Sequence, residues 1–234
     1  MIRCSVVIPT SDRPTSLERA MNALARQDMP PDEYEIIVCD GTMRDDTRAL
    51  VDHWRAVHPV PVTYVQVPTP QRGPAALRNA GARAARGEVL AFTDGDAIPE
   101  PDWLRQGWLA LSDDAADAAS GRIDVHATDE ASDNGLNSTQ LELPGLTANC
   151  FCRRRVFECV GGFDTAGRAT SPDGDLFTKL TDRGFDVVHA GDAVVVHTAH
   201  PAPRGRSYHR LAMIIQFGTK VAAAALRRGV RAIR

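Results

Sequence analysis

The chain has 234 residues, of which 43% are hydrophobic and 24% are charged, which is typical of a soluble globular protein with one large core. No apolar run approaches the ~20 residues needed to cross a bilayer, and the N-terminus does not resemble a secretory leader. We therefore expect a cytoplasmic protein. The five cysteines are an odd number and lack the paired spacing of zinc ligands, so neither a disulfide framework nor a zinc site is indicated.

Charge is unevenly distributed along the sequence. Residues 204–234 contain eight Lys or Arg residues and no Asp or Glu, which leaves 19 basic and 30 acidic residues in the first 203. This acidic body would repel a phosphate backbone, and the basic segment lacks aromatic stacking platforms, so we expect no nucleic-acid partner. We predict a basic amphipathic helix in this tail. It would pack on the acidic body, close over a diphosphate as a lid, or contact an anionic membrane at the inner face.

Three apolar runs rich in β-branched residues, at 4–10, 34–40 and 88–94, predict the first strands. Their near-continuous apolarity favours a parallel sheet that is covered on both faces. Helical patterns lie between and after them, at 14–27, 45–57 and 75–86. This alternation predicts a single α/β domain with a mostly parallel, doubly wound sheet and helices on both faces. We expect a nucleotide-binding half at 1–96 and an acceptor-binding half at 97–203.

The second half of the chain has weaker patterns. Residues 121–146 are polar and without clear periodicity, which predicts a loop. A helix is predicted to begin at Ser171 and Pro172, because a serine cap, a proline in the first turn and following acids are typical of helix starts. Residues 186–200 predict one or two further strands, and the basic helical tail follows at 204–234.

Polar residues follow each of the three apolar runs. Pro9 and Thr10 end the first and Asp40 ends the second, while Asp94 and Asp96 follow the third. Ligands of doubly wound sheets bind outside the carboxyl ends of the strands, so these segments are expected at one crevice. The two aspartates offer hard oxygen ligands for Mg²⁺ or Mn²⁺, with a solvated turn as the alternative.

Other candidates are less specific. Asp40 would accept hydrogen bonds from a base or ribose, or simply precede the turn at Gly41. Arg72 and Arg78 would pair with phosphate, or lie solvated on a helix surface. His197 would meet the metal or serve as a hydrogen-bonded structural histidine.

The sequence resembles the family 2 inverting glycosyltransferases of GT-A fold over roughly residues 5–197. Five stretches carry the resemblance in the order of the family: "SVVIPTSDRPTSLERAMNALARQ", "EIIVCDGTMRDDT", "RGPAALRNAGARAARGEVLAFTDGDAIPEPDWL", "ANCFCRRRVFECVGGFD" and "PDGDLFTKL". One such motif alone would be weak evidence for the family, whereas five in the order of the family are a specific signal.

The resemblance implies a role for each matching residue. Pro9, Thr10 and Asp12 would line the nucleotide pocket, with Asp40 against the base. Beside these matching residues, we also expect Arg13, Arg72, Arg78 and Asp94 to bind the nucleotide. The divalent cation on the diphosphate would be held by Asp94, Asp96 and His197. Asp173 would be the general base, with Asp175 as the next candidate. The chain departs from the family pattern at Asp12, Cys39 and Pro172, where Asn, Asp and Glu are usual.

The expected activity is metal-dependent transfer of a sugar, with inversion, from a nucleotide diphosphate sugar, most simply a UDP-sugar. The acceptor would be a hydroxyl of a glycan, a lipid-linked sugar or a small molecule. A sugar-nucleotide nucleotidyltransferase would share the sheet and the acidic pair, but it should have a glycine-rich loop where this chain has "PTSDRP". A nucleotide-sugar-binding protein without turnover is the third interpretation.

Overall fold

The computed structural model describes residues 1–11, 13–42, 44–68, 73–112, 116–127, 139–141, 147–166, 172–199 and 232–233. Two predicted nucleotide-binding residues, Asp12 and Arg72, lie outside these ranges, as does almost all of the predicted basic helical tail. The side chain of Asp173 is also outside the described part of the structure, although its backbone belongs to a helix.

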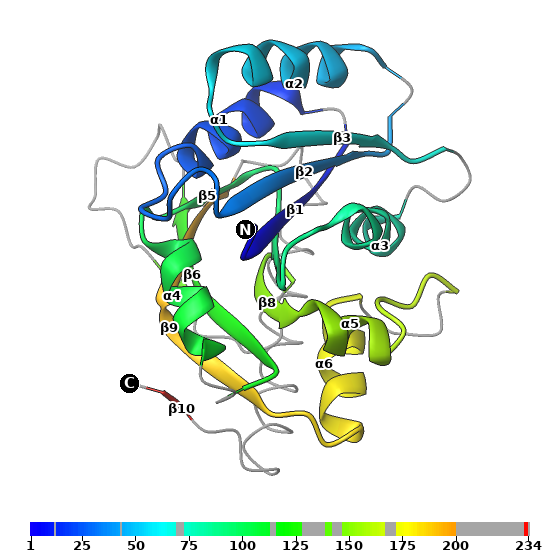
Figure 1. Ribbon diagram of the computed structural model, residues 1–234, viewed down its shortest axis with the longest axis vertical. Helices are drawn as coiled ribbons and strands as arrows, with labels where there is room; N and C mark the ends of the chain where they lie inside the picture. The colour runs from blue at the N-terminus through cyan, green and yellow to red at the C-terminus, as the bar shows by residue number, and fades with distance from the viewer. Residues whose placement is uncertain are drawn as a thin grey trace.

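The described residues form one α/β domain (Figure 1). Its strands are β1 Cys4–Thr10, β2 Tyr34–Asp40, β3 Val62–Gln66, β4 Val89–Thr93, β5 Ala97–Pro99, β6 Ala118–Ala127, β7 Thr139–Leu141, β8 Asn149–Arg153, β9 Val187–Ala199 and β10 Ala232–Ile233. Its helices are α1 Pro14–Leu24, α2 Asp46–Val57, α3 Pro74–Ala84, α4 Trp103–Ala110, α5 Arg154–Cys159 and α6 Pro172–Asp182. None of the helices in these ranges is both long enough and apolar enough to span a membrane.

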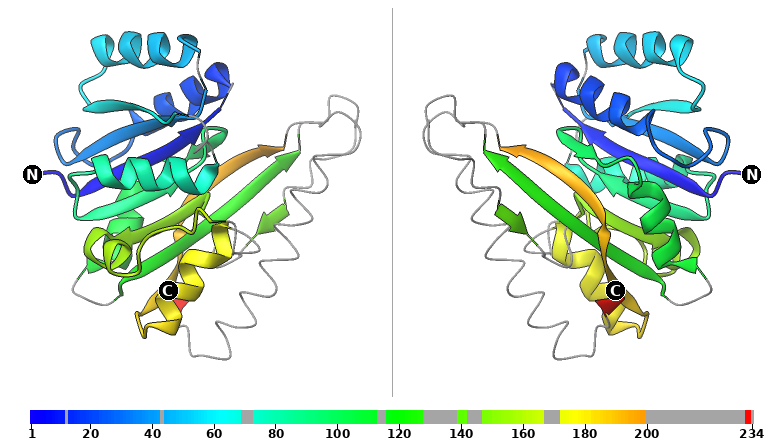
Figure 2. Two further views of the ribbon diagram at one scale, coloured as in Figure 1. Left: turned by 90° about the vertical axis from the view of Figure 1, so that its right-hand side faces the viewer. Right: turned by 90° about the vertical axis from the view of Figure 1, so that its left-hand side faces the viewer.

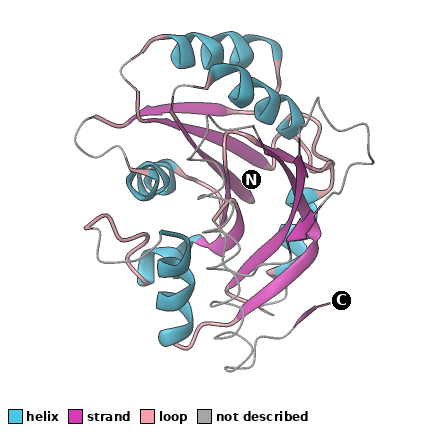
Figure 3. Cartoon of the chain, turned by 180° about the vertical axis from the view of Figure 1, so that it is seen from behind, coloured by secondary structure: helices cyan, strands magenta, loops and turns pink. Residues whose placement is uncertain are grey.

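All ten strands belong to one curved sheet (Figure 3). Its main path runs β3-β2-β1-β4-β8-β6-β9-β10, while β5 pairs with β9 and β7 with β6. The strands β3, β2, β1 and β4 are mutually parallel, as predicted for the first half. The second half is mixed, because β8 is antiparallel to both β4 and β6, whereas β9 is parallel to β6.

Helices cover both faces of the sheet, as the continuous apolar strands predict. In β1, Val6 and Ile8 face a core that contains residues of α1, α2 and α4. Val7, on the opposite face, belongs to a second core with residues of α3, α5 and α6. Figure 1 shows α1 and α2 on one side of β1–β3 and α3 on the other. Burial on both faces explains why these strands show no polar alternation.

The predicted loop at 121–146 is partly wrong, because β6 occupies its first seven residues and β7 occupies residues 139–141. Polar residues such as Arg122 and Asp124 hide this strand in the sequence, but they pair with each other at 3.1 Å. The backbone of β6 pairs along its length with β9, and the two strands run side by side in Figure 2. The last residues of the predicted helical tail also differ from expectation, because β10 pairs in parallel with β9.

Close packing of α3 on β1 and β2 depends on Gly81. A Cβ added there would lie 2.4 Å from Val7 Cγ1 and 2.7 Å from Cys39 Sγ, and both side chains are fully buried. Alanine in place of this glycine therefore requires α3 to move away from the sheet.

We expect Gly81→Ala to lower the free energy of unfolding by about 1–2 kcal/mol, because overpacking outweighs the gain of about 1 kcal/mol in helix propensity. Urea denaturation measures the difference. Gly191→Ala is the control, since its nearest contact would be an ordinary 3.6 Å. Equal stability of the wild type and Gly81→Ala would contradict this account of the α3 packing.

Candidate functional site

The carboxyl ends of β1, β2 and β4 meet at one edge of the sheet, as predicted. Thr10 pairs with Asp40 in the register of β1 and β2, and the Gly41 N–H donates to the carbonyl of Thr10 at 3.1 Å. The turn after β4 lies against the same edge, because a Cβ added to Gly95 would be 3.6 Å from both Pro9 O and Thr10 Oγ1. The turn at Gly95 therefore lies against both the backbone of Pro9 and the side chain of Thr10.

Asp94, Asp96 and His197 form a cluster whose ligand atoms all lie within 4.8 Å of one another. The aspartates flank Gly95, and β5 follows at once. β5 pairs antiparallel with β9, which places Ala97 opposite His197. This register brings an imidazole from the far end of the sequence beside the acidic pair, where the three side chains are half-buried.

Positive charges compensate both carboxylates. Arg78 Nη2 lies 2.7 Å from Asp94 Oδ1, and Arg13 Nη1 lies 3.0 Å from Asp96 Oδ2. His197 Nε2 lies 3.2 Å from the other oxygen of Asp96. Burial tends to raise the pKa of Asp96, but the hydrogen bond with His197 and the charges of His197 and Arg13 outweigh it, so this pKa lies below its usual value.

Asp40 is fully buried and accepts hydrogen bonds from three groups. Its Oδ1 accepts from the backbone N–H of Thr42 at 2.7 Å, while Oδ2 accepts from the hydroxyls of Thr42 at 3.0 Å and Tyr64 at 2.8 Å. Burial, and then the hydrogen bond and charge of Asp40, raise the pKa of Tyr64. Contact of Asp40 with a nucleotide base stays a prediction, since its carboxylate is engaged on both oxygens here.

Asn79 fastens α3 to the turn that follows α5. Its side chain donates to the Phe163 carbonyl at 2.9 Å and accepts from the Phe163 N–H at 3.0 Å. The ring of Phe163 lies 5.9 Å from the Arg78 guanidinium, and Gly162 precedes it with φ +65°. The same turn therefore contacts both Arg78 and Asn79, two neighbouring polar residues of α3.

Asp175 continues this chain of contacts into α6. Its Oδ2 accepts from the Asp164 N–H at 2.8 Å and lies 2.6 Å from Lys179 Nζ, which also donates to the carbonyl of Gly162. This carboxylate holds the start of α6 against the glycine turn. Asp173 lies in the first turn of the same helix.

Sequence reasoning missed the roles of Tyr64, Asn79 and Lys179. A tyrosine near the end of an apolar strand and an asparagine in an alanine-rich helix carry no distinctive pattern by themselves. Lys179 offered one weak signal, because it follows Asp175 at the i,i+4 spacing of helical ion pairs.

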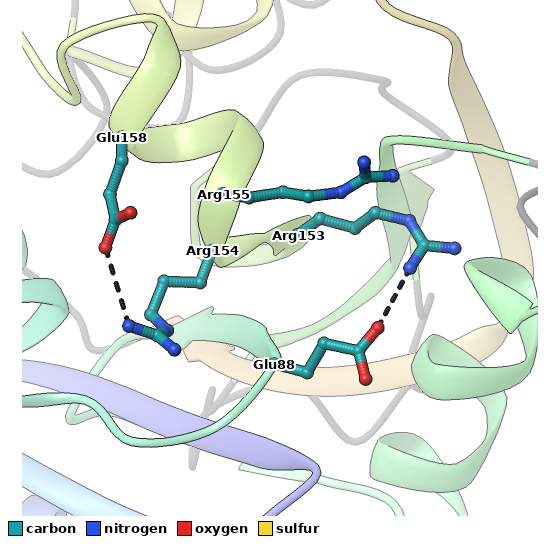
Figure 4. Close-up of a pocket in the computed structure, with 5 residues that line it drawn as sticks. All are labelled: Glu88, Arg153, Arg154, Arg155 and Glu158. Atoms are coloured by element: carbon teal, nitrogen blue, oxygen red, sulfur yellow. Dashed lines mark hydrogen bonds and ion pairs between the residues drawn. The ribbon is translucent and has the colours of Figure 1, made fainter.

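Figure 4 shows a hollow that contains three arginines. It is separate from the cluster of Asp94, Asp96 and His197. It is at the amino end of β4, whereas the acidic pair follows the carboxyl end. Its arginines are engaged in structural contacts: one pairs with an acid at 3.0 Å and another at 3.6 Å. The residues that line it are Glu88, Arg153, Arg154, Arg155 and Glu158.

The model of the family described as "Glycosyl transferase family 2" matches residues 5–166 of this chain, which include the acidic pair and the glycine turn. The chain belongs to glycosyl transferase family 2. The glycosyltransferase AglE of Haloferax volcanii is 26% identical over 207 residues, which are 84% of this chain and 67% of AglE. The succinoglycan biosynthesis protein ExoO of Rhizobium meliloti is 32% identical over 152 residues, covering 64% of this chain and 42% of ExoO.

Solved structures share the fold. The mannosyltransferase PcManGT from Pyrobaculum calidifontis, in complex with GDP-Man and Mn²⁺, superposes with a TM-score of 0.73 at 25% identity, over 99% of this chain and 66% of that one. TarS of S. aureus, residues 1–349 in complex with UDP-GlcNAc, superposes with a TM-score of 0.69 at 18% identity, over 97% of this chain and 72% of that one. The chain thus spans about two thirds of AglE and of PcManGT.

We expect Asn79→Ala to lower the free energy of unfolding by about 1–2 kcal/mol, because it leaves both backbone groups of the buried Phe163 without their partners. Urea denaturation measures this loss. Asn22→Ala, which removes one hydrogen bond to Trp54, is the control and should cost less. A smaller loss for Asn79→Ala than for the control would show that the clamp does not hold the turn.

Proposed function

We propose that this protein transfers a sugar from a nucleotide diphosphate sugar to an acceptor hydroxyl, with metal assistance and inversion at the anomeric carbon. The observation that carries the proposal is the Asp94, Asp96 and His197 cluster at the carboxyl edge of the parallel strands. Membership of family 2 and the likeness to a mannosyltransferase in complex with GDP-Man and Mn²⁺ support it.

The cluster fits a divalent cation by its chemistry. Two carboxylates and an imidazole supply up to three ligands and leave coordination positions for phosphate oxygens and water, as is typical of Mg²⁺ and Mn²⁺. Bound there, the ion would stabilise the negative charge that develops on the leaving diphosphate.

The nucleotide would lie along the edge formed by the three strand ends. Gly95, which has no side chain of its own, would let a diphosphate approach the backbone beside Pro9 and Thr10. Arg78 and Arg13 present guanidinium groups that match phosphate oxygens. Asp40, at the end of β2, would face the base; we propose uridine as the nucleoside.

Asp173 is our candidate for the general base. Inversion by single displacement needs one carboxylate that removes the proton of the acceptor hydroxyl as it attacks. Asp175 is the weaker candidate, because Lys179 and the Asp164 N–H already occupy its Oδ2. The helix start favours an ionised Asp173, and the negative charge of the donor would restore basicity.

We expect a UDP-sugar, tested beside GDP- and dTDP-sugars, to raise the melting temperature of the wild type in the presence of Mn²⁺. At a ligand concentration one hundred times its Kd, the free energy of unfolding rises by about 2.7 kcal/mol, which raises the melting temperature by roughly 5–10 °C for a chain of this size. Asp96→Asn should lose the gain, while Asp52→Asn, in an exposed ion pair on α2, should keep it. Failure of every sugar nucleotide to stabilise the wild type would overturn the proposed function.

Substitution of the two acids of α6 should separate catalysis from support. Asp173→Asn should slow transfer at least about 100-fold while Mn²⁺-dependent nucleotide binding persists, because only proton removal is lost. Asp175→Asn should instead lower the free energy of unfolding by about 1–2 kcal/mol through loss of the ion pair with Lys179. Transfer at the wild-type rate by Asp173→Asn would rule it out as the base.

A further inference from the structure

Two arginines offset the negative charges of the acidic pair, and His197 also contacts Asp96. Asp94 and Asp96 carry two negative charges, and each forms an ion pair with an arginine, at 2.7 and 3.0 Å. A divalent cation that approaches these two carboxylates alone therefore competes with the two guanidinium groups. This arrangement disfavours metal binding until further negative charge arrives.

The two arginines differ in their freedom to move away. The side chain of Arg78 is only 6% exposed and lies over the ring of Phe163, so it stays where it is. The side chain of Arg13 is 55% exposed, and its contact with Asp96 is the exposed kind of ion pair that contributes little stability. Its backbone is anchored at the start of α1, where its carbonyl accepts from the Leu17 N–H at 3.1 Å. Only the side chain needs to reorient.

We propose that Arg13 is an exchange residue that pairs with Asp96 in the free protein and with a phosphate oxygen of the nucleotide when a divalent cation takes its place on Asp96. The exchange couples the two ligands, so that each increases the affinity for the other. The inference rests on the proposed function, because it requires that metal and nucleotide meet at this cluster.

The exchange lets Arg13 change its partner from Asp96 to a phosphate while each charged group keeps a partner of opposite charge. Metal alone displaces the guanidinium from Asp96 and leaves two positive groups side by side, which is unfavourable. With a diphosphate present, the displaced guanidinium finds oxygens that match its fork, and the cation gains phosphate ligands. By linkage, the factor by which nucleotide raises metal affinity equals the factor by which metal raises nucleotide affinity.

The test is Mn²⁺ binding to the full chain, measured by the electron paramagnetic resonance of free Mn²⁺, without nucleotide and with saturating UDP or GDP. For the wild type we expect nucleotide to tighten Mn²⁺ binding roughly 10- to 100-fold. Arg13→Gln should bind Mn²⁺ alone about fivefold more tightly, because Asp96 loses its competitor, and should gain less from nucleotide. The affinity for Mn²⁺ in the absence of nucleotide would thus rise in a variant whose affinity for nucleotide falls.

Arg105→Gln is the matched control, since it removes an exposed arginine from an ion pair with Asp28 away from the cluster. It should behave as the wild type. Arg13→Lys should still bind Mn²⁺ weakly in the absence of nucleotide, because it keeps the positive charge. It should lose part of the coupling between metal and nucleotide, because lysine lacks the forked guanidinium that matches phosphate oxygens. If circular dichroism shows that Arg13→Gln is misfolded, Arg13→Lys takes its place in the test of the exchange.

The outcomes separate this inference from the proposed function. If neither UDP nor GDP tightens Mn²⁺ binding to the wild type, both are overturned. If nucleotide does so but Arg13→Gln, or Arg13→Lys in its place, is indistinguishable from Arg105→Gln, the exchange is wrong and the function stands. Tighter metal-alone binding together with reduced coupling in Arg13→Gln supports the exchange.

Discussion

Two carboxylates at the end of a buried strand require cationic or hydrogen-bonding partners, and the structure supplies such partners from three distant segments. Arg13 follows β1, Arg78 comes from α3, and His197 comes from β9. None of them neighbours the acidic pair in sequence, so the site exists only when the sheet and α3 are assembled. Charge compensation of this pair is the constraint on which the proposed nucleotide site, the proposed metal site and their coupling depend.

The same contacts tie the cluster to the helix that bears the candidate base. Arg78 meets Asp94 on one side and the ring of Phe163 on the other, while its neighbour Asn79 clamps the backbone of Phe163. The next residue in the turn donates to Asp175 of α6. A continuous line of packing and hydrogen bonds therefore runs from the acidic pair to α6. Loosening this turn would disturb both ends of a transfer reaction at once.

Sequence patterns predicted the parts of the fold that are buried on both faces. The apolar runs of β1, β2 and β4 were unambiguous, and the rule for strand ends brought Thr10, Asp40 and Asp94 to one edge. β6 was missed because Arg122 and Asp124, which pair with each other, make its sequence polar, and because β9, its partner along its whole length, is distant in sequence. His197 could be named from the sequence, but its place beside Asp96 depends on the pairing of β5 with β9. β5 has only three residues and shows no sequence pattern of its own.

Crystals soaked with MnCl₂ and UDP would locate the metal by anomalous scattering at the manganese edge. We expect one strong peak within coordination distance of Asp94 or Asp96, next to the diphosphate, with the Arg13 side chain turned away from Asp96. A diphosphate bound without manganese at these carboxylates, or manganese bound elsewhere on the chain, would contradict this expectation.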